Sequence, residues 1–260
     1  MENCGRIICG TPDSGPHFIF VHGWGSCKEM WLEIIANLPQ PCYAVAVDLP
    51  GTGETPDIPN LTMTALSEWM VHALDCLGMS RVNIVGHSLG GHIAASFALR
   101  FPAHVSHLVL VSAPTSMRTL SLHAYVPLMG RFGSAVLGMH WILNRKLSHH
   151  IRRIRYSSTS RTKRIDYMSE QNTPIGLRNQ LKALRTTDLD CQDASHFDAP
   201  VLVMHGDSDT MVTREASSQW RKIFPHSESA TIPGGGHSFF DSEPARFAEC
   251  VYSFCARSVK

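Results

Sequence analysis

Short apolar runs recur along the chain, and a turn sequence follows each of them. The apolar runs have the length of buried strands and occupy residues 17–21, 43–48, 82–85, 105–112, 201–205 and 228–232. Amphipathic segments with helical periodicity occupy residues 31–38, 63–77, 91–101, 216–223 and 245–256. Alternation of buried strands with helices predicts an α/β fold, with a mainly parallel sheet flanked by helices.

The alternation stops between residues 114 and 185. This stretch lacks clear strand patterns, contains several helical segments and is too long for an ordinary loop. We therefore expect residues 1–113 and 186–260 to form the α/β core, and residues 114–185 to form a helical cap over the strand ends. The apolar residues of the cap would either pack against the sheet or roof a channel.

Charge divides the chain at the same boundaries. The whole chain carries +1, which does not indicate a nucleic-acid binder, but residues 114–185 hold thirteen lysines and arginines against Asp166 and Glu170. The predicted cap therefore carries +11 and the predicted core −10. A solvated helical face is the ordinary explanation of a charge run, but mixed signs would serve solubility equally well. We expect an anionic partner for the cap.

The first residues, the longest apolar tract and the cysteines indicate in which cellular compartment the protein is expected. The start, MENCGRIICG, lacks the basic and apolar regions of a secretory signal. The longest apolar tract, residues 121–143, is interrupted by Pro127 and Arg131, unlike a transmembrane span. Eight scattered cysteines show neither CxxC pairs nor zinc-like spacing, which favours small buried side chains in a reducing compartment. We expect a soluble cytoplasmic protein without a metal site.

The stretch GHSLGG, residues 86–91, lies between an apolar run and a helical segment. The pattern G-x-S-x-G in this setting is typical of a nucleophile elbow, a sharp turn that holds a serine hydroxyl in the open. Gly86 and Gly90 would give the turn its room around Ser88. The amide of Leu89, at the start of the helix, would point toward a developing oxyanion.

A serine nucleophile needs a base, and the base needs an orienting acid. His237 follows a glycine run directly after an apolar run, which places it on a turn at a strand end; a glycine-rich surface loop is the alternative. Asp207 and Asp209 follow another apolar run, in the sequence GDSDT. An aspartate directly after a glycine can cap a turn, so we assign that role to Asp207 and the orienting role to Asp209.

The sequence HGWG, residues 22–25, follows the first long apolar run. Gly23 lets the backbone approach closely, and the amide of Trp24 would point inward beside that of Leu89 as a second oxyanion donor. The indole of Trp24 would line an acyl pocket; a simple turn with a packed indole is the alternative. We expect His22, Gly23, Trp24 and Leu89 to line the substrate site.

With HGWG, DLPGTGET, GHSLGG, GDSDTMV and GGGHSFF in this order, the chain resembles the α/β-hydrolase family over nearly its full length. The resemblance implies Ser88 as nucleophile, His237 as general base and Asp209 as its partner. It also implies an acyl-enzyme intermediate, with no metal or organic cofactor. Serine at the elbow excludes the dehalogenase and epoxide-hydrolase branches, which use aspartate there.

The phrases VDLPGTG, LRTTDLD and HSFFDSEPARF are also similar to the carboxylesterases that demethylate pimeloyl methyl ester on acyl carrier protein in biotin synthesis. This resemblance implies a methyl ester of a medium-chain acyl group on that carrier as the substrate. Acyl carrier proteins are acidic and present a phosphate, which arginines bind well. The candidate docking residues are Arg145, Arg152, Arg153, Arg155, Arg161 and Arg164.

Other functions stay open on the sequence. A thioester could replace the methyl ester. Apolar helices beside arginines would also suit an anionic membrane surface, which predicts an esterase for lipids or small esters. A third hypothesis, from another class, is a hydrolase fold that has lost catalysis and acts as a receptor or scaffold.

Overall fold

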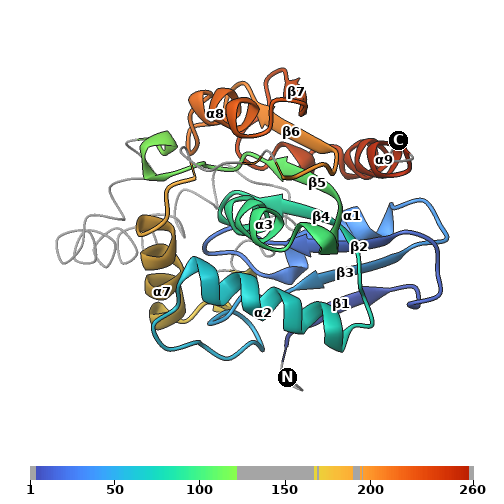
Figure 1. Ribbon diagram of the computed structural model, residues 1–260, viewed down its shortest axis with the longest axis horizontal. Coiled ribbons are helices and arrows are strands. Elements are labelled where there is room, and N and C mark those ends of the chain that lie inside the picture. The colour runs from blue at the N-terminus through green and yellow to red at the C-terminus, as the bar shows by residue number, and fades with distance from the viewer. Residues whose placement is uncertain (1–3, 122–166, 169, 190–193, 195, 258–260) are drawn as a thin grey trace, which may run out of the picture.

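The computed structural model describes residues 4–121, 167–168, 170–189, 194 and 196–257. Its sheet has seven strands in the order β1-β3-β2-β4-β5-β6-β7 (Figure 1). The strands are β1 (Arg6–Cys9), β2 (His17–Val21), β3 (Tyr43–Val47), β4 (Val82–His87), β5 (Val105–Val111), β6 (Val201–Gly206) and β7 (Glu228–Ile232). Neighbours pair in parallel except β1, which is antiparallel to β3. The predicted α/β fold with a mainly parallel sheet is confirmed.

Helices cover both faces of this sheet (Figure 1). Side chains of α2 (Met63–Cys76), α3 (Leu89–Arg100) and α8 (Glu215–Ile223) share one buried cluster with the first face. Those of α1 (Leu32–Ala36) and α9 (Pro244–Cys255) share a second cluster with the other face. Strands β3 to β6 are consequently buried on both sides, which is why they read as continuous apolar runs.

Two details at the N-terminal end differ from the sequence prediction. The sequence pattern does not indicate strand β1, because its four residues RIIC hold only three consecutive apolar residues and form an edge strand with alternating exposure. The helix expected at residues 31–38 is a 3-10 turn, Lys28–Trp31, followed by the short α1.

The cysteines differ in their burial: Cys27, Cys42 and Cys255 are buried as expected, whereas Cys76 and Cys250 are exposed.

The strand register places several turns at one edge of the sheet. Val21 of β2 lies opposite Gly86 of β4, and His87 lies opposite Val111 of β5. Gly206 at the end of β6 lies opposite Ile232 at the end of β7. Because these strands are parallel, the segments that follow them emerge side by side at their carboxyl ends, where α/β sheets bind ligands.

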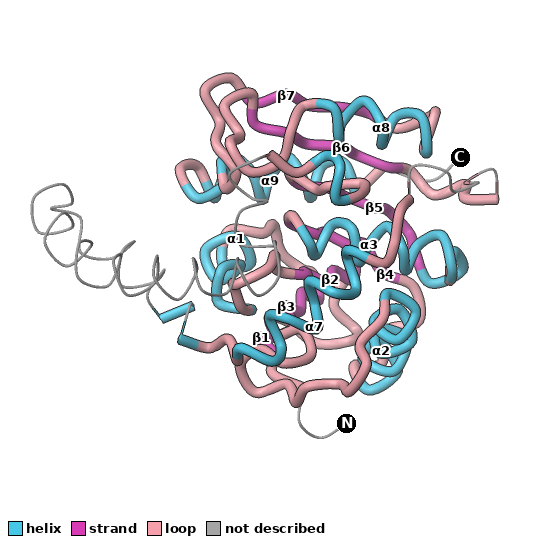
Figure 2. Tube along the Cα trace, turned by 90° about the vertical axis from the view of Figure 1, so that its left-hand side faces the viewer, coloured by secondary structure: helices cyan, strands magenta, loops and turns pink. Residues whose placement is uncertain are grey.

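The described end of the predicted cap is helix α7 (Pro174–Arg185), which lies against the core near the ends of β2 and β3 (Figure 2). Gln180 is fully buried and donates hydrogen bonds to Pro50 O and Thr52 Oγ1, both at 3.0 Å. A side chain on Gly176 would meet Gly51 O at 2.3 Å, so the two backbones touch. The first residues of the predicted cap, up to Ser121, pair instead with the loop after β6 through Leu120 and Val212.

Residues 122–166 lie outside the described part of the chain, so the helical cap between these two attachments stays a prediction. Within the described residues, no helix has both the length and the apolar content needed to span a membrane.

Candidate active site

Ser88 is the single residue between strand β4 and helix α3. Its backbone has φ 53° and ψ −121°, a conformation that costs free energy for any residue other than glycine. Its N–H donates to Val111 O at 2.9 Å, and its own carbonyl accepts from Gly91 N at 2.9 Å and His92 N at 3.2 Å. These bonds on both sides hold the strained turn in place.

The glycines of GHSLGG are required by close contacts around this turn. A Cβ on Gly86 would lie 2.4 Å from Gly90 O, and a Cβ on Gly90 would lie 2.3 Å from Val21 O. Both atoms are backbone and cannot move aside cheaply. The elbow therefore needs small residues on both sides of Ser88, as the sequence pattern predicts.

Asp209 and His237 meet beside this turn. His237 Nδ1 lies 2.9 Å from Asp209 Oδ2, and the side-chain exposure is 21 % for His237 and 0 % for Asp209. Asp209 Oδ1 accepts from Met211 N at 2.7 Å and Val212 N at 3.0 Å. Burial alone would raise the pKa of Asp209. The hydrogen bond to His237, the positive charge of His237 and the two backbone donors together lower this pKa to about 2. Asp209 is thus a fixed anion behind a partly exposed imidazole.

Asp207 has a different environment. Its Oδ1 accepts from Gly234 N at 2.7 Å and from Ser208 Oγ at 3.0 Å, and Arg214 lies 3.8 Å from its carboxylate. These contacts join the turn after β6 to the glycine run before His237. Among the described residues, Asp209 and not Asp207 is the carboxylate bonded to that histidine.

The HGWG loop packs directly on the elbow. A Cβ on Gly23 would lie 3.1 Å from Ser88 Cβ and 3.0 Å from His87 Nδ1, so the glycine backbone lies against the serine. Trp24 is half-buried, and its indole N–H donates to Leu177 O of α7 at 2.9 Å. The loop that carries the predicted oxyanion donor is therefore tied to α7 as well as to the elbow.

His22 makes its hydrogen bonds to backbone atoms. Its side chain is fully buried; Nδ1–H donates to Gly23 O at 2.8 Å and Nε2 accepts from Leu49 N at 3.0 Å. Burial lowers its pKa, so the ring is neutral in this bonded arrangement. The buried side chain of His22 thus fixes the loop through backbone bonds, and the expectation that this residue lines the substrate site stays a prediction.

Two histidines near the pair were not singled out from the sequence. His87 Nε2 lies 3.0 Å from His237 O, and the two ring centroids are 4.7 Å apart. His205 Nε2 lies 3.8 Å from Asp209 Oδ2, and burial lowers the pKa of this side chain. Both occupy strand ends beside a predicted site residue, GHS and MHGD, and that placement is the signal that could have found them.

His87 directly precedes Ser88 in the chain, and its ring packs against that of His237. Within the described part of the chain, no hydrogen bond joins Ser88 Oγ to His237. Bonds between a nucleophile and its base are often long without substrate and tighten when substrate binds.

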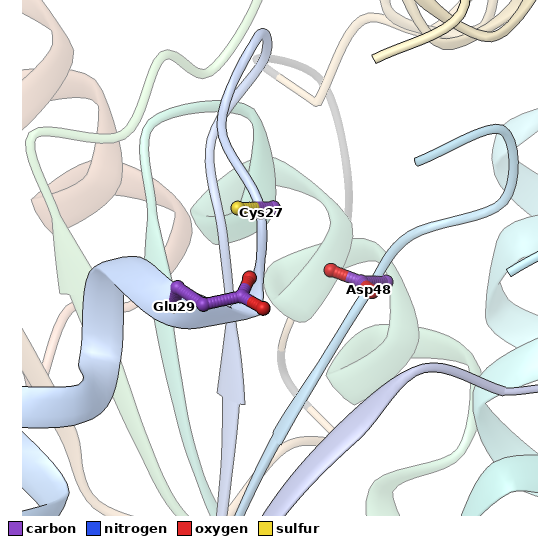
Figure 3. Close-up of side chains that lie close together, drawn as sticks. All are labelled: Cys27, Glu29 and Asp48. Carbon is purple, nitrogen blue, oxygen red and sulfur yellow. The ribbon is translucent and has the colours of Figure 1, made fainter. Parts of the chain in front are cut away.

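A second cluster of potential ligands lies at the end of β3. Cys27, Glu29 and Asp48 place one ligand atom each within 4.8 Å of the others, with the carboxylates directed toward one another (Figure 3). Lys28 Nζ already contacts Asp48 Oδ2 at 2.7 Å and Glu29 Oε1 at 3.2 Å. Burial and the bond to Glu29 raise the pKa of Cys27, which keeps its thiol protonated and a poor ligand. The lysine ammonium therefore supplies the cation of this cluster.

The predicted docking arginines Arg145, Arg152, Arg153, Arg155, Arg161 and Arg164 lie outside the described residues. Helix α7, at the end of the same basic segment, exposes Arg178 and Lys182 four residues apart on one face. Ile175 precedes them on that face and is 62 % exposed.

Residues 16–244 match the family model of the alpha/beta hydrolase fold. The chain belongs to this family. The resemblance inferred from the motifs is confirmed, and the protein is a hydrolase enzyme.

Relatives of the chain within this family differ in their named activities. The chain is 26 % identical to pimeloyl-[acyl-carrier protein] methyl ester esterase of Nitrosomonas europaea, over 92 % of this chain and 96 % of that protein. It is 25 % identical to sn-1-specific diacylglycerol lipase ABHD11 of Danio rerio, over 95 % of this chain and 80 % of that protein. A hydrolase of Pseudomonas aeruginosa has the same fold, with a TM-score of 0.76 at 22 % identity, covering 98 % and 94 % of the two chains.

Proposed function

We propose that the protein is a carboxylic ester hydrolase that works through an acyl-enzyme on Ser88. The observation that carries this proposal is the Asp209–His237 pair at 2.9 Å beside the strained turn of Ser88. A buried anion, a partly exposed imidazole and a hydroxyl on a sharp turn are the three parts that serine hydrolysis needs.

In the proposed reaction, Ser88 Oγ attacks the ester carbonyl carbon while His237 Nε2 takes the hydroxyl proton. Asp209 accepts the Nδ1–H bond of His237 and stabilises the imidazolium that forms. The backbone amides of Trp24 and Leu89 would stabilise the tetrahedral oxyanion, each worth about 10²–10³-fold in rate. The alcohol leaves with the proton from His237. Water, deprotonated by the same ring, then attacks the acyl-enzyme, and the acid is released from Ser88.

Labelling with a fluorophosphonate tests the nucleophile directly. Wild-type protein is expected to take one label, and Ser88→Ala none, because the reagent needs an activated serine. Asp209→Asn is expected to slow labelling strongly. An unlabelled wild type would favour the receptor or scaffold hypothesis instead.

For the substrate we propose a methyl ester of a medium-chain acyl group on acyl carrier protein. Two observations support this choice: the Nitrosomonas europaea relative is named for that substrate, and residues 114–185 carry +11. An acidic carrier with a phosphate would be steered to such a surface, in a manner that salt weakens.

The test compares pimeloyl methyl ester free in solution with the same ester on acyl carrier protein, at low and high salt. Reversal of Arg152, Arg153 and Arg155 to Glu is expected to lower kcat/KM for the carrier-bound ester only. Reversal of Arg221 and Lys222, exposed on α8 of the core, is the matched control and should change little. Equal rates on both esters, indifferent to salt, would exclude the carrier while leaving the esterase intact.

A second candidate substrate is a glycerolipid ester at an anionic surface. The exposed Ile175 beside Arg178 and Lys182 on α7 would suit such a surface, and the Danio rerio relative is named a diacylglycerol lipase. Faster hydrolysis of diacylglycerol in anionic vesicles than in neutral vesicles would favour this candidate over the carrier-bound ester.

A further inference from the structure

His87 directly precedes the proposed nucleophile in the chain and packs against the proposed base. It is the last residue of β4, directly before Ser88, and its side chain is almost fully buried. Its ring packs against His237, with centroids 4.7 Å apart at an angle of 52°, and edge-on against Phe240 at 5.1 Å. The His87 ring is therefore in contact with the His237 side chain while its backbone is continuous with Ser88.

One hydrogen bond fixes the chemistry of this contact. His87 Nε2 lies 3.0 Å from the backbone oxygen of His237. A carbonyl oxygen only accepts, so Nε2 carries the hydrogen and the neutral ring has a bare Nδ1. That Nδ1 is buried without a partner among the described residues and faces the Gly23 backbone. The ring is thus oriented by the bond at Nε2.

The base lies on a loop that packing holds at one point and leaves open on either side. Gly235 packs against the end of β6, where a Cβ on Gly206 would lie 2.2 Å from Gly235 O, whereas a Cβ on Gly234 or Gly236 would meet nothing within 4 Å. Hydrogen bonds therefore add to this packing in setting the position of the turn. Gly234 N donates to Asp207 and Gly235 O accepts from Ser208 N at 2.9 Å, which fix the start of the run. Among the described residues, the hydrogen bond to the backbone of His237 itself comes from His87.

We propose that His87 is a positioning residue that sets His237 relative to Ser88, by donating a hydrogen bond from Nε2 to the main-chain carbonyl of His237. This inference rests on the proposed function, in which Ser88 and His237 exchange a proton. Because His87 and Ser88 are adjacent in the chain, one rigid turn then determines the positions of both reacting groups. Displacement of a reacting group by about 1 Å can cost about 10²-fold in rate.

A neutral donor suits this position better than a charged one. Burial and the nearby charge of His237 lower the pKa of His87 to about 3, while Asp209 and the bond to the carbonyl act in the opposite direction. When His237 takes the serine proton it becomes positive, and a lysine or arginine at residue 87 would repel it. Neutral His87 supplies the hydrogen bond without adding a second positive charge beside the His237 imidazolium.

Three substitutions separate the hydrogen bond from the packing. The amide nitrogen of His87→Gln can reach the position of Nε2, that of His87→Asn reaches only the position of Nδ1, and His87→Phe fills the space without a donor. With a p-nitrophenyl ester, Gln is expected to keep kcat within about threefold of wild type, whereas Asn and Phe lower kcat by about 10–100-fold. KM should stay within about twofold, because His87 does not face the substrate.

A spectroscopic readout distinguishes positioning from a general structural defect. The low-field proton resonance of the His237–Asp209 hydrogen bond should persist in the Gln variant and broaden or vanish in Asn and Phe. Equal kcat in all three variants, or the same loss in Gln as in Asn, would overturn the proposal. Ser88→Ala tests the proposed function separately: if this variant hydrolyses the ester at the wild-type rate, the proposed function itself fails. If it is inactive and the His87 series is flat, only the positioning role fails.

Discussion

Asp209 and Asp48 are two buried aspartates with nearly the same set of hydrogen bonds and different consequences. Each follows a strand of the sheet, and each side chain has 0 % exposure. Asp209 accepts backbone N–H bonds with Oδ1 and His237 with Oδ2. Asp48 accepts Lys28 N with Oδ1 at 2.9 Å and Lys28 Nζ with Oδ2 at 2.7 Å. The carboxylate geometry alone does not distinguish a reactive site from a structural one.

The cationic partner makes the difference. Burial alone would lower the pKa of Lys28, but its bonds to Asp48 and Glu29 raise it, so this ammonium stays charged and the pair is permanent. The Lys28 side chain is 9 % exposed, whereas that of His237 is 21 % exposed. In the proposed mechanism the partner of Asp209 exchanges a proton with substrate, whereas the partner of Asp48 stays a buried and charged part of the structure.

The largest expected effect is on the rate. Asp209→Asn should lower kcat for ester hydrolysis by about 10⁴-fold, because the amide can hold His237 in the wrong tautomer and cannot stabilise its charged form. Asp207→Asn is the matched control two residues away. It should retain kcat within about tenfold, since its carboxylate bonds to the turn. Steady-state kinetics of both variants decide the point, and equal losses would mean that the acid has been misassigned.

Asp48→Asn should lower the stability of the protein strongly and its catalytic rate only slightly. Removal of one member of a buried ion pair leaves Lys28 charged without its main partner, at an expected cost of about 3–5 kcal/mol in the free energy of unfolding. Rates per folded molecule should change far less than in Asp209→Asn. Urea denaturation followed by fluorescence measures the loss.

The double variant Lys28→Met/Asp48→Asn is the control for that experiment. Its loss should be smaller than the sum of the two single losses, because neither charge is then left alone. Strictly additive losses would show that the two side chains do not stabilise each other.

The pH dependence of stability tests the anionic state of Asp209. Its pKa is about 2 in the folded protein against an ordinary value of 3.8, so ionisation stabilises the fold above pH 3.8 and the benefit disappears as the pH falls toward 2. The shift corresponds to about 2 kcal/mol. The difference in unfolding free energy between wild type and Asp209→Asn should therefore shrink across this window. A difference that is constant from pH 5 to pH 2 would contradict the lowered pKa.

The comparison also shows what a sequence can predict. Asp209 and His237 could be expected to meet, because β6 and β7 are neighbours in a parallel sheet and both residues follow strand ends. The Lys28–Asp48 pair could not, since it joins two loops whose contact depends on side chains filling one buried space. In the same way, the contact of Gly51 with Gly176 depends on how α7 docks. Periodicity determines strands and helices, but says little about which loops touch.

The sequence also does not show which histidines are buried. His22 and His87 occur in the motifs HGWG and GHSLGG, yet nothing in the one-dimensional pattern distinguishes a histidine that faces substrate from one that bonds to backbone. The distinction arises from the tertiary structure, since a turn distant in sequence supplies the partner: the Leu49 amide for His22 and the His237 carbonyl for His87. The strand β1 was missed for a related reason, because its pairing with β3 and not its apolar content defines it.

The smallest expected effect tests whether burial decides the strength of the Lys28 contacts. Glu54 Oε2 lies 3.7 Å from Lys28 Nζ, but the Glu54 side chain is 76 % exposed. Water screens such a contact, so Glu54→Gln should change the free energy of unfolding by no more than about 0.5 kcal/mol. The backbone N–H of Glu54, which donates to Asp48 Oδ2 at 3.3 Å, is unaffected by the substitution. A loss as large as that of Asp48→Asn, in the same urea titration, would mean that the Lys28 cluster acts as one network and that exposure does not rank its members.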